Sequence, residues 1–385
     1  MMLPQTALLT FLFATTTSMA GLAAQSTWVV DASRGAGYTH VDIGAAIASA
    51  SHGDFIEVRA GTYASPGSIR KGVRIVGRPG ATIDIGNIGF PFSIQGVPAG
   101  QVCVIRGFMI KGLYTSSGFA YISDNPGVVA LQDLKTSTAL ILTAGISVLR
   151  CPAVYLDRCQ IVGGLRIESS TVTITGGRFD DNRAAAAILA KKTSLTLSGI
   201  QATGLMFSTQ GLPALEVQAS AVILSKAVGA RLAASSGSSG IPAILGDSAS
   251  TLVYDPGVQL VPNSGTQAIQ GFASITSRRL PTLDLRGGAL GQSLSLDLRS
   301  PQGDFYALFV GLPGKPLALP FGDLWLDLRL VILISAGLQG STGLSTTVVP
   351  IPSRVALRGV TLSWQAQSGS WPHQEYTNAC LGVVH

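Results

Sequence analysis

The amino-acid sequence predicts an all-β protein in which a parallel β-helix is followed by an antiparallel β-sandwich. Six short segments between Cys103 and Leu224 share one template, in which two inward apolar residues flank a single outward residue, as one face of a strand requires. The second inward residues are 26, 25, 18, 23 and 27 positions apart, and a strand-rich period of roughly 20–50 residues is typical of a solenoid. Charged residues make up only 12% of the chain and glycines number 46, which favours strands and tight turns over helices. The six inward pairs are Cys103/Ile105, Val129/Leu131, Val154/Leu156, Val172/Ile174, Leu195/Leu197 and Val222/Leu224.

Residues 1–24 have the features of a cleaved secretory signal. An apolar segment over 7–14 is too short to span a bilayer, and small residues follow it at Ser18 and Ala20. No later segment reaches the ~18 uninterrupted apolar residues of a transmembrane helix. We therefore expect an exported protein that is secreted or held at the cell surface.

Residues 25–276 are expected to form the β-helix. They begin with a strand over Trp28–Asp31, a short amphipathic helix over Val41–Ala50 and a strand over Phe55–Arg59. The segment WVVDASRGAGYTHVDIGAAIASASHGDFIEVRAGTY, followed by KGVRIVGRPGATI, resembles the start of pectin-lyase-like right-handed β-helix proteins, including pectinesterases. The resemblance covers about residues 28–265 and implies a right-handed parallel β-helix whose first coil is capped by the short helix, which shields the core and strand edges from water.

Residues 277–385 are expected to form the β-sandwich. Gly and Pro turns separate about eight strand-like segments, as in antiparallel sandwiches. The segments FGDLWLDL, LRGVTLSWQAQ and EYTNACLGVV resemble a C-terminal module of exported bacterial proteins, which implies secretion or surface display. The expected strands are 282–286, 293–298, 306–312, 324–328, 330–334, 346–351, 357–365 and 379–384.

Four cysteines in an exported chain raise the question of disulfides. Cys103 and Cys159 both lie at inward positions two coils apart, roughly 9.6 Å at ~4.8 Å per strand step, which exceeds the separation a disulfide spans. We therefore expect them to be core thiols. A Cys151–Cys159 disulfide within one coil is the open alternative, and Cys380, in the last strand, is expected to be unpaired.

The resemblance to pectin-active β-helices implies catalytic carboxylates on the outer surface of adjacent coils. The outward positions of the template carry a single carboxylate, Asp157, and acid–base or nucleophilic chemistry needs more than one group. Where a pectinesterase has its nucleophilic Asp soon after a glycine, this chain has Leu165 and Arg166. We therefore interpret Asp157 as a solvated residue at a strand edge, and expect a protein without the usual catalytic residues.

The alternative is a polysaccharide lyase or carbohydrate esterase with a divergent site formed by Asp157, Arg166, Asp180 and Asp181. Asp180 and Asp181 begin the polar segment DDNR, which is compatible with Ca²⁺ binding or, as we favour, with a solenoid turn. The four histidines show no metal-ligand spacing, and no phosphate-binding glycine loop is present. We expect neither a metal nor a cofactor.

Ligand binding is the function that the sequence favours. The net charge is +6, and the densest basic segment places Arg74 outward between the inward Val73 and Ile75. A merely solvated basic face is the alternative interpretation. We predict a glycan-binding or structural and adhesion protein whose partner is a polysaccharide or cell-envelope glycan rather than nucleic acid. The candidate ligand-binding residues are Arg70, Arg74, Arg78, Arg106, Tyr155 and Trp371.

The outer face of the β-helix also carries an apolar row. It comprises Val104, Ala130, Tyr155 and Ile223, all at outward positions of the template. An apolar row of this kind needs a cover. A loop, the sandwich or a second subunit could supply it, and in the last case the protein would self-associate through this face.

Overall fold

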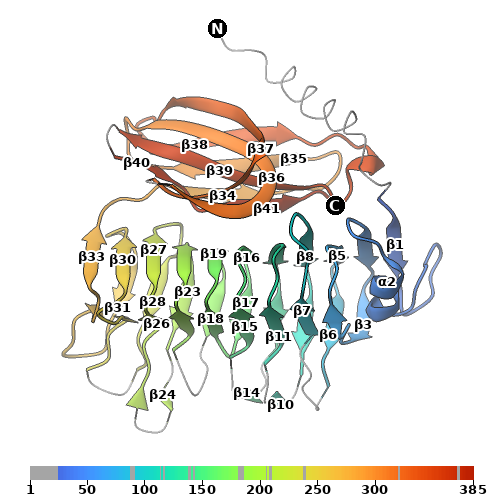
Figure 1. Cartoon of the computed structure of the whole chain (residues 1–385), viewed down its shortest axis with the longest axis horizontal. Coiled ribbons are helices and arrows are strands. Elements are labelled where there is room, and N and C mark those ends of the chain that lie inside the picture. Colours follow the sequence, from blue (N-terminus) through green and yellow to red (C-terminus); the bar gives the residue numbers. More distant parts are fainter. Residues whose placement is uncertain are drawn as a thin grey trace.

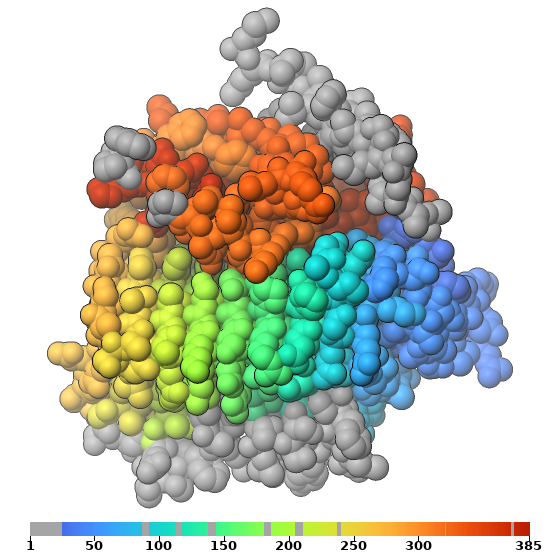
Figure 2. Space-filling model, in the orientation of Figure 1, coloured from blue at the N-terminus to red at the C-terminus, as the bar shows by residue number. Residues whose placement is uncertain are grey.

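Three parallel sheets wind into a β-solenoid, and the C-terminal strands form an antiparallel sandwich along one side of it (Figures 1 and 2). The computed structural model describes residues 25–385 except 87–91, 113, 116–117, 138–139, 142–143, 181–185, 205, 208–209, 237–239, 320 and 371–372. The predicted fold class is confirmed. The predicted signal over 1–24, as well as Asp181 and Trp371, lie outside the described residues.

Sheet A has eleven strands, and sheets B and C have nine each. Sheet A contains β1 (Thr27–Val30), β2 (Phe55–Val58), β5 (Arg74–Gly77), β8 (Val102–Arg106), β12 (Val128–Gln132), β16 (Val154–Asp157), β19 (Thr171–Thr175), β22 (Ser194–Ser198), β27 (Ala221–Ser225), β30 (Thr251–Tyr254) and β33 (Ser274–Ser277). Sheet B contains β3 (Gly61–Ala64), β6 (Ala81–Asp84), β9 (Met109–Lys111), β13 (Lys135–Thr136), β17 (Gln160–Val162), β20 (Arg178–Asp180), β23 (Gln201–Thr203), β28 (Arg231–Ala233) and β31 (Gln259–Val261). Sheet C contains β4 (Ser68–Ile69), β7 (Phe92–Gln95), β11 (Ala120–Ser123), β15 (Ile146–Leu149), β18 (Leu165–Glu168), β21 (Ile188–Lys191), β26 (Leu215–Gln218), β29 (Ile244–Leu245) and β32 (Ile269–Gln270). Two short pairs, β10 (Tyr114–Thr115) with β14 (Leu140–Ile141) and β24 (Met206–Phe207) with β25 (Gln210–Gly211), project at the side opposite the sandwich (Figure 1).

The register of sheet A confirms the inward template. Val129 pairs with Cys103 on one side and Val154 on the other, and Leu131 pairs with Ile105 and Leu156. All twelve predicted inward residues are buried in one continuous core. Alternation along each strand and stacking between coils therefore place the same position of every coil inside.

Left-handed backbone at the corners turns each coil from one sheet to the next. Between sheets A and B, Asp133 and Arg158 have φ of 51° and 49°, a region that non-glycine residues adopt only at some cost. Neighbouring coils use glycine at the same corner, namely Gly107, Gly176 and Gly199. Asp133 and Arg158 consequently lie at the edge of the outer face of sheet A.

A helix caps the N-terminal end of the solenoid, as predicted. Helix α2 (Ile43–Ser49) buries Ile43 and Ile47, and the Asp42 side chain accepts a hydrogen bond from the Ala45 amide at 2.7 Å. At its other end, Lys71 Nζ donates to the carbonyl oxygens of residues 47, 48 and 50 at 2.6–2.9 Å. This lysine thus belongs to the cap rather than to a ligand site.

The C-terminal region consists of two antiparallel sheets around a separate apolar core. One sheet contains β34 (Thr282–Arg286), β35 (Ser293–Arg299) and β38 (Leu344–Pro350), and the other contains β36 (Phe305–Leu319), β37 (Gly322–Leu338), β39 (Thr361–Ser370), β40 (His373–Tyr376) and β41 (Cys380–Val383). The separate strands predicted over 324–328 and 330–334 are one continuous strand, β37. Its pairing with β36 shifts register between Leu326 and Val331, so the strand continues past the polar residues there. The start of the strand predicted from Leu357 belongs to a 3₁₀ turn over Val355–Leu357, and β40 was not predicted.

The sandwich covers the apolar outer row of sheet A. Val104, Ala130 and Tyr155 form a buried cluster with Trp325, Leu381 and other sandwich residues. The Tyr155 hydroxyl lies 3.2 Å from Ser363 Oγ, and its ring meets that of Trp325 edge to face at 4.8 Å. Ile223 lines a small cavity at the same interface. The sandwich is therefore the cover, so the predictions of self-association through this row and of Tyr155 as a ligand contact are wrong.

All four cysteines are buried and unpaired. Cys103 and Cys159 lie in the solenoid core, as expected, and Cys380 packs in the sandwich core. Cys151 precedes β16 and Cys159 follows it, so the two lie at opposite ends of one strand. This arrangement rules out the alternative disulfide within that coil.

Candidate functional site

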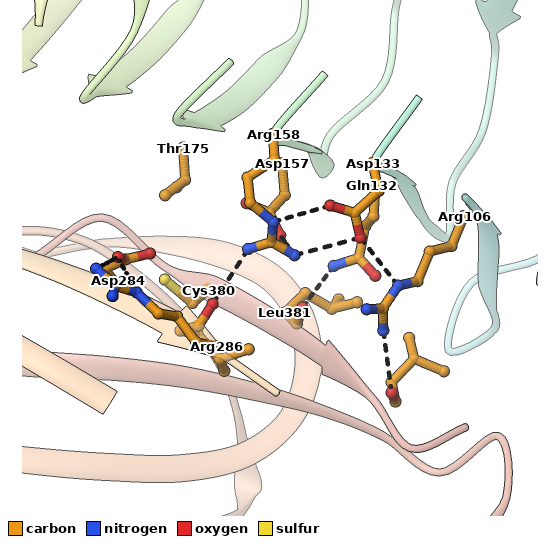
Figure 3. A network of polar contacts seen from close by, with 12 residues as sticks. Arg106, Gln132, Asp133, Asp157, Arg158, Thr175, Asp284, Arg286, Cys380 and Leu381 are labelled. Atoms are coloured by element: carbon orange, nitrogen blue, oxygen red, sulfur yellow. Dashed lines mark hydrogen bonds and ion pairs between the residues drawn. The ribbon is translucent and has the colours of Figure 1, made fainter. Parts of the chain in front are cut away.

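The carboxyl ends of the sheet A strands meet β34 and β41 of the sandwich in a polar network (Figure 3). Gln132 Nε2 donates to the Leu381 carbonyl at 2.5 Å, and Asn378 Nδ2 donates to Thr175 Oγ1 at 3.1 Å. Gln132 and Thr175 are the last residues of β12 and β19, and both lie at outward positions of the template. The outer face of sheet A, where the resemblance implies catalytic residues, is therefore an interface within the chain.

Four charged side chains occupy the centre of this network (Figure 3). Asp133 accepts from Arg106 Nε at 3.0 Å and from Arg158 Nε at 2.9 Å. Arg158 also pairs with Asp157 at 2.8 Å and donates to the Leu285 carbonyl of β34 at 3.1 Å. Although burial favours protonation, Arg158 and Arg106 hold the pKa of Asp133 below its usual value. The ion pairs thus join neighbouring coils to one another, and the hydrogen bond from Arg158 joins them to the sandwich.

Asp157 is only 8% exposed, and one of its oxygens, Oδ1, has no hydrogen-bond partner in the described part of the chain. Burial raises the pKa of its carboxyl to about 7, against the opposing effect of Arg158. The interpretation of Asp157 as a solvated strand-edge residue is therefore wrong. Its position beneath the sandwich also keeps it from contacting a polymeric substrate.

The other catalytic candidates do not converge on Asp157. Arg166 lies on sheet C and pairs with Glu168 at 3.0 Å, whereas Asp180 lies on sheet B and pairs with Arg178 at 2.5 Å. One coil passes through all three sheets, so residues close in sequence are distributed around its circumference. The divergent catalytic site suggested for these residues is not assembled among those that the structure describes.

A cavity of about 340 Å³ lies beside the network, lined by Arg106, Asp133, Arg158, Asp284 and Arg286 among others. Each of these cations already has a carboxylate partner, including Arg286, which pairs with Asp284 at 2.9 Å. The charges lining this cavity are therefore neutralised locally. Among its described lining residues, each arginine is therefore already paired rather than free for an anionic ligand.

Most of the arginines predicted to contact a ligand instead form contacts within the chain. Arg74 donates to the Gly53 carbonyl at 2.5 Å and to Thr361 Oγ1 of the sandwich at 3.2 Å. Arg78 pairs with Glu57 at 3.0 Å, and Arg106 belongs to the network described above. Arg70 alone of these predicted ligand contacts is exposed and makes no ion pair with a described residue. The predictions of Arg74, Arg78 and Arg106 as ligand contacts are therefore wrong, because contacts within the chain already engage all three side chains.

A larger cleft, here called the basic cleft, lies between the last coils and the sandwich. Its volume is about 960 Å³. The solenoid contributes the turns that follow β27 and β30, and the sandwich contributes the end of β35 and the turn before β38. Its charged lining residues are Lys226, Arg231, Arg279, Arg299 and Asp255.

The four cations of the basic cleft have no carboxylate partners among the described residues, whereas its one carboxylate is engaged. Asp255 accepts hydrogen bonds from the Gly257 amide at 2.7 Å and the Leu280 amide at 3.0 Å. Lys226, Arg231 and Arg279 are exposed and Arg299 is partly buried, and none forms an ion pair in the described ranges. Clustered like charges repel one another. An anionic ligand would relieve this repulsion.

Sequence reasoning missed the basic cleft because its cations are scattered. Lys226 lies in the turn after β27, and Arg231 is the first residue of β28. Arg279 lies in the connection to the sandwich, and Arg299 ends β35. No local run of basic residues marks them. The only indication in the sequence was the overall composition, in which 26 Lys and Arg residues exceed 20 Asp and Glu residues.

No group of three or more His, Cys, Asp or Glu residues in the described part of the chain is arranged to hold a metal ion. No helix among the described residues is long and apolar enough to cross a membrane.

Comparison with known proteins finds only distant matches. No family model and no curated protein matches this chain. Among solved structures, the enzymatically active domain of tailspike protein 2 of bacteriophage CBA120 matches at 10% identity and a TM-score of 0.35, over 85% of this chain and 72% of that one. The full-length tailspike protein 2 from an Escherichia coli O157:H7 bacteriophage also matches at 10% identity and a TM-score of 0.35, over 87% of this chain and 65% of that one. Similarity this low carries no argument about ligand or activity.

Proposed function

We propose that this is an exported surface protein that binds acidic polysaccharides in the basic cleft. The observation that carries the proposal is a set of four cations in one cleft of about 960 Å³, none of which has a carboxylate partner in the part of the chain that the structure describes. Three of the four are arginines, whose planar guanidinium group can donate two parallel hydrogen bonds to a carboxylate or sulfate. Charge therefore favours an acidic glycan over a neutral one.

The polymeric nature of the ligand rests on other features. The leader-like segment over 1–24 and the opening that resembles pectin-lyase-like proteins both favour an exported protein that meets polysaccharides. The basic cleft spans two corner turns and two sandwich turns, so it can contact several sugar units at once. Val228, which is 78% exposed on its lining, offers apolar surface to the C–H faces of a sugar ring.

The test is binding of the purified protein to polygalacturonate, alginate and chondroitin sulfate, with dextran as the neutral polymer, by titration calorimetry. Arg231→Glu in the solenoid and Arg299→Glu in the sandwich should each weaken binding of an acidic polymer by roughly tenfold or more, because each loses a charge-assisted contact of about 1.5–3 kcal/mol. Arg70→Glu is the matched control. It makes the same charge change at an exposed cation near the other end of the solenoid.

Three outcomes would contradict the proposal. Equal binding of dextran would remove the role of charge, and an equal loss in Arg70→Glu would indicate non-specific attraction to a basic protein. The third is release of unsaturated uronate, methanol, acetate or new reducing ends in the same mixtures, which would replace binding with catalysis. Affinity should also fall as salt rises, because exposed charges are screened.

A further inference from the structure

Exposed apolar side chains are concentrated on one hairpin of the sandwich, formed by β36 and β37. Leu328 and Leu338 are 66% and 72% exposed, and Leu333 is 48% exposed. Soluble proteins rarely leave such groups together unless the surface has a partner. The hairpin carries half of the large apolar residues that are exposed in the described part of the chain, namely Phe305, Leu317, Leu328, Val331, Leu333 and Leu338.

These side chains continue the interface between sandwich and solenoid. In the register of the sheet, Val331 pairs with Gly311, Gly311 with Ser363 and Ser363 with Leu381, so the four lie on one face. Ser363 and Leu381 contact the solenoid on that face. Leu333 pairs with Phe309 and Leu338 with Phe305 in the same two strands. The apolar face therefore extends from a buried interface to the margin of the sheet.

Strand β37 is that margin. It ends the strand order β37-β36-β39-β40, so its outer backbone groups pair with no described strand. It is also long, at 17 residues. An exposed edge strand of this length is a template for pairing with another strand, and natural proteins usually protect such edges with charge or proline.

The charges of this strand do not provide that protection. Asp327 and Arg329 pair with each other at 2.5 Å, and the sequence from Leu330 to Leu338 carries no charged residue. This uncharged, apolar edge offers nothing for a charged partner to pair with. A second copy of the same edge matches it in both polarity and charge. Leu328 and Leu338 each lie five residues from Leu333 in the sequence, so an antiparallel pairing of two β37 strands centred on Leu333 brings the Leu328 end of one strand to the Leu338 end of the other.

We propose that β37 is a dimer interface, at which a second copy of this chain pairs antiparallel and extends the five-stranded sheet across both molecules. The pairing satisfies the outer backbone groups of both edges and brings the exposed apolar side chains of the two β37 strands into contact across the new strand pair. The surface is separate from the basic cleft, so each dimer presents two clefts. This inference does not depend on the proposed ligand.

The test is sedimentation velocity on the purified protein from about 1 µM to about 1 mM. We expect a monomer–dimer equilibrium in the native chain, weakened about tenfold or more in Leu333→Glu. Val355→Glu is the control, because Val355 is 68% exposed but lies in the 3₁₀ turn away from β37. Hydrogen exchange adds a local measurement, since amides over 328–338 should become more protected as concentration rises.

A strictly monomeric native chain at about 1 mM would overturn the proposal, as would a dimer that Leu333→Glu leaves unchanged. Unchanged thermal unfolding of the variant would exclude loss of folding as the cause of dissociation. A monomer that instead binds phosphatidylethanolamine–phosphatidylglycerol vesicles through the same residues would reassign the face to a membrane and equally refute the dimer.

Discussion

Replacing Asp157 by asparagine should stabilise the protein, and increasingly so as pH rises. Burial beneath the sandwich raises the pKa of this carboxyl from 3.8 to about 7, while Arg158 and Arg106 oppose the shift and Asp133 and Asp284 reinforce it. Between about pH 3.8 and pH 7, the Asp157 carboxyl has lost its proton in the unfolded chain but still holds it in the folded chain. The free energy of unfolding therefore falls as pH rises through this range. Above about pH 7 the carboxyl is ionised in both states, and the folded state is destabilised by the full cost of the buried charge. At 1.36 kcal/mol per pKa unit, this cost amounts to about 4 kcal/mol.

The measurement is urea unfolding of the native chain and Asp157→Asn at about pH 5 and about pH 8.5. Asparagine has nearly the same shape and no charge, so the stability advantage of the variant should grow by about 2–3 kcal/mol between these two pH values. Asp180→Asn, which removes a carboxylate on sheet B away from the sandwich, serves as the control and should show no such growth. An advantage of Asp157→Asn that stays constant or shrinks with rising pH would refute the account of a carboxyl desolvated at the interface.

Three further predictions test the interface, the corners and the core. Tyr155→Ala should lower the free energy of unfolding by about 3–5 kcal/mol because it empties the buried contact with the sandwich, and a loss below about 1 kcal/mol in urea titrations would mean that the sandwich is not docked there. Gly145→Ala should destabilise by about 1–3 kcal/mol, since a Cβ there would lie 2.5 Å from the Val162 carbonyl oxygen, whereas Gly340→Ala meets no atom within 4 Å and should be neutral in thermal melts. The thiols of Cys103 and Cys159, whose pKa burial raises to about 12, should resist Ellman's reagent until the protein unfolds; rapid labelling of the native state would contradict their place in the core.

The solenoid could be predicted because its signals are local. An inward pair such as Val129 and Leu131 is defined by alternation within one strand, and the stacking of coils needs only a repeated spacing. The capping helix was predictable for a similar reason, because an amphipathic segment next to an open end of the solenoid has one apolar face to bury. The long strand β37 was divided in the prediction because polar residues at Asp327 and Arg329 interrupt its apolar pattern.

The site could not be predicted in the same way, because it depends on which distant segments meet. The outward position of Asp157 was read correctly from alternation, but its burial depends on strands more than a hundred residues later in the chain. The basic cleft likewise joins Lys226 and Arg231 of the solenoid to Arg299 of the sandwich. Strand alternation and coil spacing are local properties that the sequence by itself determined. The docking of the sandwich, the raised pKa of Asp157 and the clustering of unpaired cations were decided only by the tertiary structure, because burial and electrostatic interaction depend on distance in space rather than on separation along the chain.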